Sequence, residues 1–136
     1  MDPNDVADEL TARLDTITGL RCFGYPPATV VPPAAIVSYP ESIEFDQTYG
    51  RGMDRISAWP VLIVVGKATD RSAREKVYGY AAATGATSVK AVLESGTYTS
   101  FDTIRVVDAS FDVVTIAGND YISALFTLDI AGQGSA

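Results

Sequence analysis

Residues 103–132, TIRVVDASFDVVTIAGNDYISALFTLDIAG, decide the fold class of this chain. Two long runs of β-type residues flank Gly118 and Asn119, a pair typical of the turn of a β-hairpin. The second run has one apolar face, formed by Ile122, Ala124, Phe126, Leu128 and Ile130. The other face carries Tyr121, Ser123, Thr127 and Asp129, with Leu125 as an apolar exception. This alternation predicts a strand that buries one face.

Three segments upstream have helical spacing. Residues 3–18 form an expected helix that Asp2 caps and Pro3 opens, and its apolar stripe is Val6, Leu10, Leu14 and Ile17. Gly19 is expected to end it. Residues 70–83 predict a second helix, with Asp70 as its cap and a buried stripe of Ala73, Val77, Tyr80 and Ala81. Residues 88–95 predict a short third helix that buries Val89, Val92 and Leu93 and ends at Gly96.

A second β region precedes these two helices. Residues 24–35 hold four prolines and predict an ordered crossing segment, and residues 35–39 predict a strand. Apolar and polar residues then alternate on both sides of YGRG, which predicts a projecting hairpin over residues 43–58. In that hairpin Phe45 should face Ile56, and Asp46 should face Arg55. The second arm continues into PVLIVVG, where Pro60 is expected at a bulge or a sheet edge.

These elements predict one α+β domain over residues 1–136. A mostly antiparallel sheet should pack against the N-terminal helix and the two central helices, and the hairpin should project from it. A chain of 136 residues with 47% hydrophobic residues can bury a real core.

The composition limits the chemistry of the chain. The net charge of −7 argues against a surface that grips nucleic acid, because phosphate contacts need clustered Lys and Arg. There is no histidine and only one cysteine, so triads that rely on histidine and Cys/His zinc sites are excluded within one chain. No apolar signal core and no apolar run of about 20 residues is present, so we expect synthesis in the cytoplasm and no membrane span.

Four kinds of possible chemistry have simpler interpretations. GRG at 50–52 and GKAT at 66–69 lack the remaining glycines and the hydroxyl residue of phosphate-binding loops. Asp46 and Asp54 could form an acid/base pair, but a solvated hairpin with cross-strand ion pairs explains them better. Cys22, next to Phe23, is expected to be a small buried residue instead of a nucleophile. The scattered carboxylates form no calcium loop. We therefore expect no enzyme activity, no cofactor and no metal.

The aromatic residues Tyr25, Tyr39, Tyr49, Trp59, Tyr78 and Tyr80 are not spaced as a base-stacking platform, and we expect them in the core or at a subunit interface. A polar, glycine-tipped hairpin suits contact with another subunit or partner. The residues predicted to make that contact are Tyr49, Arg51, Met53, Asp54 and Arg55.

Several stretches, in this order, resemble the tail terminator proteins of long-tailed, non-contractile (siphovirus-type) bacteriophages. They are GYPPATVVPPAAIVSYPESI (24–43), YGRGMDR (49–55) followed by PVLIVVGKATDRSARE (60–75), SVKAVLESGTY (88–98) and FDVVTIAGNDYISALFTLDIAG (111–132). The likeness extends from about Thr18 to Gly132, and it is carried by the succession of stretches instead of by any single motif.

The resemblance implies a structural virion protein at the head–tail joint, an α+β subunit that assembles into a hexameric ring. Such a ring caps the tail tube, stops its polymerisation and docks to the head connector or stopper protein. DNA passes through the lumen without specific binding, and an acidic lumen would repel it. The family has no catalytic residues to transfer. By position, the hairpin over 43–58 would contact the neighbouring subunit or the tube.

Other functions remain open from the sequence. The chain could be another head–tail joining protein, such as a stopper or adaptor, or a tail tube subunit. The two helices between Asp70 and Ser95 favour a terminator over a tube protein, in which the sheet dominates. A small enzyme that uses Asp46 and Asp54, and a monomeric binding module, are the alternatives from other classes.

Overall fold

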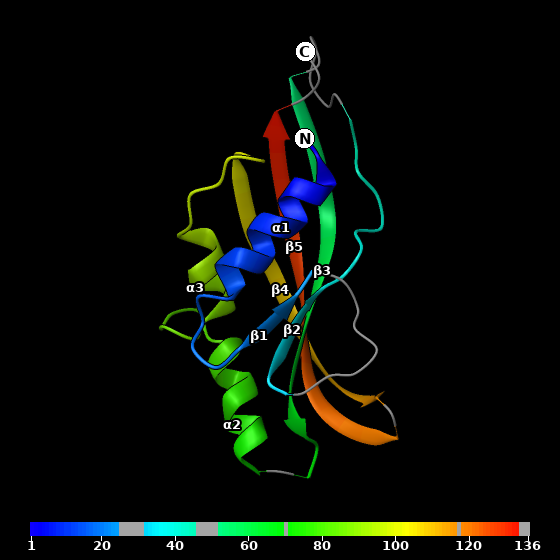
Figure 1. Cartoon of the computed structure of the whole chain (residues 1–136), viewed down its shortest axis with the longest axis vertical. Helices are drawn as coiled ribbons and strands as arrows, with labels where there is room; N and C mark the ends of the chain where they lie inside the picture. Colours follow the sequence, from blue (N-terminus) through cyan, green and yellow to red (C-terminus); the bar gives the residue numbers. More distant parts are fainter. Residues whose placement is uncertain (25–31, 46–51, 70, 117, 134–136) are drawn as a thin grey trace.

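The computed structural model describes residues 1–24, 32–45, 52–69, 71–116 and 118–133. Five strands form one mixed sheet in the order β1-β2-β3-β5-β4. The strands are β1 (Arg21–Phe23), β2 (Ala34–Val37), β3 (Met53–Lys67), β4 (Thr103–Ile116) and β5 (Asn119–Gln133). The helices α1 (Pro3–Leu14), α2 (Arg71–Tyr80) and α3 (Val89–Glu94) lie over one face of the sheet (Figure 1). The predicted α+β class with a mostly antiparallel sheet is confirmed, because β1 and β2 are the only described strands that pair in parallel.

The β4–β5 hairpin forms where the sequence predicts it. Gly118 takes a φ of +81° at the turn, a conformation that glycine adopts without the steric cost that a Cβ brings. The expected apolar face of β5 points to the core, and Ala124, Phe126, Leu128 and Ile130 are buried on it. Strand β5 also pairs with β3 along nearly its whole length. It is therefore central, while β4 is an edge strand.

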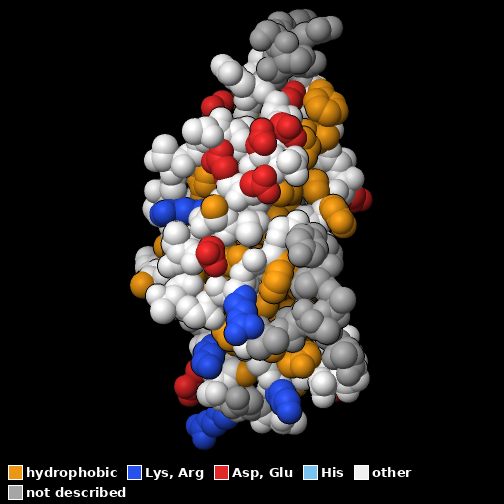
Figure 2. All heavy atoms as spheres, in the orientation of Figure 1, with side chains coloured by type: hydrophobic (Ala, Val, Ile, Leu, Met, Phe, Trp, Pro, Cys, Tyr) orange, Lys and Arg blue, Asp and Glu red, His pale blue; other side chains and the backbone are white. Residues whose placement is uncertain are grey.

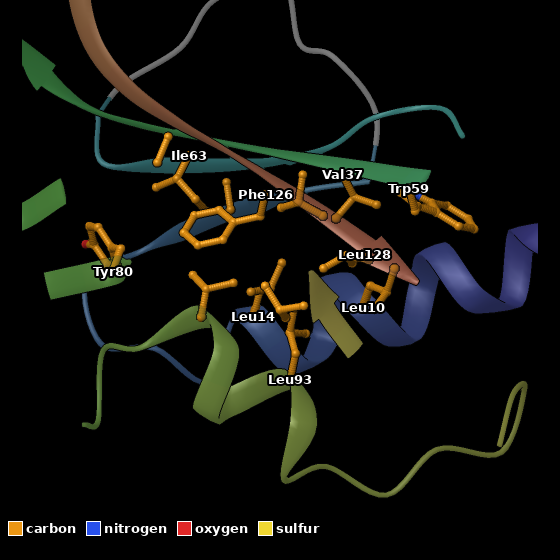
Figure 3. Close-up of a cluster of buried hydrophobic side chains, with 14 of the residues drawn as sticks. Leu10, Leu14, Val37, Trp59, Ile63, Tyr80, Leu93, Phe126 and Leu128 are labelled. Carbon is orange, nitrogen blue, oxygen red and sulfur yellow. The ribbon is translucent and has the colours of Figure 1, made fainter. Parts of the chain in front are cut away.

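The core lies between the sheet and the helices. Figure 3 shows Phe126 among side chains from both layers, with Leu10 and Leu14 of α1 and Leu93 of α3 on the helix side. The predicted stripe of α1 is buried in full, including Ile17 in the turns after the helix. Asp2 caps α1 by accepting a hydrogen bond from the Asn4 amide at 2.9 Å. Removing apolar surface of this kind from water is the main favourable term in folding.

Several predicted boundaries were too long. The first helix ends at Leu14 instead of residue 18, and the second ends at Tyr80 instead of residue 83. The predicted strand 35–39 is Ala34–Val37. The parallel strand β1 was not predicted, because three residues are too few to show a periodicity. Pro60 itself pairs with Thr127 of β5, and the register shift of β3 lies just before it, between Ile56 and Trp59.

The predicted register of the projecting hairpin is wrong. The described part of its first arm meets β3 through a single bridge between Glu44 and Arg55. A Phe45–Ile56 pair would place residue 46 opposite Arg55, whereas Arg55 faces Glu44, two residues earlier in the chain. Phe45 is 62% exposed whereas Ile56 is buried, and Ile56 pairs with Ile130 of β5. Asp46 and the tip lie outside the described residues. Strand β3 is long and pairs with β5 along its length. This pairing fixes the position of β3 more strongly than the short first arm of the hairpin can.

Candidate partner-contact site

Three of the five residues predicted to contact a partner lie in the described part of the chain. They form the start of strand β3. Met53, Asp54 and Arg55 pair with the last three residues of β5. Successive side chains of a strand point to opposite faces of the sheet. Met53 and Arg55 therefore share one face, and Asp54 points to the other. Tyr49 and Arg51 lie outside the described residues.

Asp54 is buried and holds the start of the chain. Its Oδ2 atom lies 3.0 Å from the Met1 amine, and only 3% of the residue is exposed. The same amine donates to the Gln133 carbonyl at 3.0 Å. The expectation that Asp54 lies on a solvated hairpin was therefore wrong. Its role in the structure is to pair with the terminal amine across the end of the sheet.

Arg55 makes a two-point contact with Asp129 of β5. The distances are 3.1 Å from Nε to Oδ1 and 2.8 Å from Nη2 to Oδ2. These hydrogen bonds, together with the charge of Asp129, raise the pKa of Arg55 above its ordinary value. The predicted partner of Arg55 was Asp46, which would have been its neighbour in the hairpin. A bidentate contact fixes the plane of the guanidinium, so the side chain is held in place at the surface.

Met53 and Arg55 border a shallow groove of about 330 Å³. The other residues of the groove are Thr103, Ile104, Arg105, Asp129 and Ala131. Met53 is 40% exposed and gives the groove an apolar wall. Asp129 also pairs with Arg105 across β5 and β4, so it lies between two arginines. We call this set the β3 groove. It combines an apolar wall with two arginines, of which Asp129 holds Arg55 in place, and this suits contact with an apolar segment that carries an acidic group.

A second surface was not identified from the sequence. Tyr78, Phe111 and Val113 are each more than half exposed, and the rings of Tyr78 and Phe111 meet edge to face at 5.6 Å. Phe111 and Val113 pair with Ala124 and Ile122, which lie on the apolar face of β5. At Phe111 and Val113 the helices therefore cover this apolar face only in part, because Tyr78 of α2 touches the Phe111 ring while both side chains stay about half exposed. The alternation in the sequence shows which face is apolar but not where its helical cover ends.

The other aromatic residues divide between core and surface. Trp59 and Tyr80 are buried, and the Trp59 indole donates to the Ser38 carbonyl at 2.9 Å. Tyr39 is 72% exposed. Tyr25 and Tyr49 lie outside the described residues.

Cys22 is less buried than predicted, and its surroundings disfavour ionisation of the thiol. Its side chain is half-buried, and burial together with the charge of Asp15 raises its pKa to about 12. The thiolate is the reactive form, and almost none is present at neutral pH. Across the part of the chain that the structure describes, no three His, Cys, Asp or Glu side chains are grouped so that they could hold a metal ion. Within the same residues, no helix is long and apolar enough to span a bilayer.

No protein-family model and no curated protein matches this chain.

Proposed function

We propose that the chain is a structural subunit of a phage tail, of the tail terminator type. Six copies form a ring that caps the tail tube, stops its polymerisation and joins the tail to the head connector. The proposal starts from the ordered resemblance between Thr18 and Gly132. It includes no catalytic role and no cofactor.

The observation that carries the proposal is the apolar surface of an otherwise well-packed subunit. The larger exposed apolar side chains in the described residues are Tyr39, Phe45, Met53, Tyr78, Val107, Phe111, Val113 and Leu125. Isolated apolar residues are ordinary on a surface, whereas a contiguous set usually marks an interface. Tyr78 and Phe111 are in contact, and the β3 groove holds another member of the set. Ring assembly and tube capping would cover such surfaces.

The same features disfavour the enzyme alternative. Asp54, one of its two carboxylates, is buried and paired with the Met1 amine. A general acid or base must reach the proton that it transfers, and this carboxylate is occupied. In an enzyme, Asp54→Asn would remove an activity and leave assembly intact. In the structural role proposed here, Asp54→Asn would instead lower the free energy of unfolding.

The test is electron microscopy of the purified protein, alone and mixed with isolated tail tubes, together with a mass measurement. We expect closed rings, or density that caps one end of each tube, and tubes that stop growing when the protein is added. Protein that polymerises into tubes by itself would indicate a tube subunit. Protein that binds the head connector and ignores the tube would indicate a stopper or adaptor. A monomer that binds neither would refute the proposal.

The net charge of the chain leads to a further expectation for the ring. A net charge of −7 per subunit gives the assembly a strongly negative field. DNA that passes through an acidic lumen would be repelled from its wall. A positive potential in the lumen of the assembled ring would contradict this part of the proposal.

A further inference from the structure

One surface of the subunit combines exposed apolar and basic side chains. Arg71, Arg74 and Tyr78 follow each other at positions i, i+3 and i+7 of α2, so they share one side of the helix. All three are exposed, and Tyr78 rests against Phe111. The two arginines line a depression of about 400 Å³ that reaches Ile122 of β5. We call this surface the basic patch, formed by Arg71, Arg74, Tyr78, Phe111 and Val113.

The cations of the basic patch have no ionic partner within the described subunit. Among the described residues, neither Arg71 nor Arg74 lies in an ion pair. Arg74 and the exposed Tyr78 are four residues apart in α2, so a cation and an aromatic ring share one side of the helix. A partner that carries carboxylates next to apolar groups would complement both properties.

Helix α1 presents a surface with these properties. Asp5 and Asp8 are exposed on it, and Asp15 is exposed directly after its last residue. None of the three lies in an ion pair among the described residues. Asp8 and Asp15 border a groove of about 630 Å³ that also exposes Ala12 and Tyr39. We use the name acidic groove for this groove together with Asp5, which does not line it but follows the lining residue Asn4 on α1. Asp5 and Asp8 are three residues apart along α1, which is also the spacing of Arg71 and Arg74 along α2.

The two surfaces lie in different parts of the subunit. Figure 2 shows acidic side chains gathered over the upper part of the molecule, where Figure 1 places α1. Most basic side chains in that view lie over the lower part, where Figure 1 places α2. One subunit therefore presents an acidic and a basic surface at the same time.

We infer that the basic patch of one copy docks on the acidic groove of the next copy. Arg71 and Arg74 then face Asp5 and Asp8, and Tyr78 and Phe111 cover the apolar part of the groove near Tyr39. The contact is heterologous, since two different surfaces meet, so it repeats from copy to copy and closes into a ring when the rotation allows. The inference rests on the proposed function in one respect, because this contact would join the subunits of the proposed ring.

The partner that binds the basic patch is a second copy of this chain and not nucleic acid. A site for a phosphate backbone needs several cations that follow the strand, whereas this patch has two arginines beside an acidic subunit. Complementary charges favour encounter and set the register of a protein–protein contact.

The test exchanges the charges of the two surfaces. Variant A carries Arg71→Glu and Arg74→Glu, and variant B carries Asp5→Lys and Asp8→Lys. In each variant alone, both surfaces have the same sign, so we expect the loss of the self-association seen for the wild type. In an equal mixture, the acidic patch of A meets the basic groove of B, and the basic patch of B meets the acidic groove of A. Association should return, with A and B alternating, and native mass measurement reads the composition directly.

A matched control carries Arg21→Glu and Lys90→Glu. It has the same change in net charge as variant A, but its changes lie on β1 and α3, outside both surfaces. We expect it to associate like the wild type. Thermal unfolding of each variant checks folding, which matters for B because Asp5 lies in the first turn of α1, where the helix dipole favours an acid.

The outcomes separate this inference from the proposed function. Variants that assemble alone like the wild type, or a mixture that fails to assemble, overturn the inference. If A loses capture by tail tubes and the mixture with B does not restore assembly, the occupant is the tube protein, and the inference is wrong. Wild-type protein that follows the charge-exchange pattern but never caps tubes supports the inference and refutes the proposed function. Tube capping by variant A at the wild-type level would refute the inference and support the proposed function.

Discussion

Three consecutive residues at the start of β3 have different roles because the strand alternates. Met53 and Arg55 lie on the groove side, where a partner can reach them, and Asp54 lies on the buried side. The sequence suggested one contact set. The structure divides it into two surface positions and one position that holds the chain together.

Asp54→Ala is expected to lower the free energy of unfolding by about 3 kcal/mol, since it leaves the buried Met1 ammonium without its counter-charge. The measurement is denaturant unfolding at pH 7. The neighbouring Arg55→Gln change is the contrast, because it breaks an exposed pair, and pairs of that kind contribute little. Equal losses in the two variants would show that the terminal amine is not held as described.

Glu9 should make the stability of the fold sensitive to acid. Burial alone would raise its pKa, but hydrogen bonds from the Thr99 hydroxyl and from the Ser100 and Thr99 amides outweigh burial and hold the pKa below its usual range. A carboxyl whose pKa is lower in the folded state stabilises the fold above its unfolded pKa of about 4.3. That contribution is lost as the pH falls through the folded pKa.

Glu9→Gln should therefore cost about 1 kcal/mol at pH 7, a low value because solvent screens this site. Its unfolding free energy should also change less steeply than that of the wild type below pH about 4.5. Urea titrations at several pH values test both points. Parallel pH curves for the two proteins would rule out a role for the Glu9 charge.

At the scale of elements, two glycines should respond to substitution with opposite sign. Gly118 turns the β4–β5 hairpin at a φ of +81°, so Gly118→Ala should cost about 1–2 kcal/mol. Gly79 lies inside α2, and a Cβ there would first meet the Thr87 hydroxyl at an ordinary 3.6 Å. Gly79→Ala should stabilise the protein by about 0.5–1 kcal/mol through helix propensity. Thermal unfolding measures both, and a loss in each case would contradict the stated conformations.

The elements that the sequence predicted well are those with long periodic patterns. The β4–β5 hairpin and the buried stripe of α1 agree with expectation because many residues repeat one spacing. The register near Glu44 was missed, since a short arm offers few residues to align and β5 competes for the same strand. The burial of Asp54 could not be predicted, because its partner is 53 positions away in the chain. The exposure of Phe111 depends on where the helices stop, which no local pattern records.

At the scale of the whole molecule, the β3 groove should matter for tube capping and not for folding. Met53→Asp places a charge on a side chain that is already 40% exposed, so the unfolding free energy should change by less than about 0.5 kcal/mol. Density at tube ends should disappear, because the apolar wall of the groove is lost. Ala83→Asp, which adds the same charge at an exposed site outside the groove and outside the exposed apolar set, serves as the control. Loss of capping in both variants would remove the groove from the proposal.

The outer edge of β4 has a consequence for handling the protein. Two of its amides are covered by carboxylates: Glu94 accepts from the Val106 amide at 2.9 Å, and Asp112 accepts from the Val113 amide at 2.7 Å. Bare strand edges are templates for aggregation, and charged groups are a common protection. Near the sequence pI of about 4.3 the molecules cease to repel each other, so this edge loses the protection of the net charge. Acidified stocks should therefore form β-rich fibrils that bind thioflavin, whereas neutral stocks remain clear.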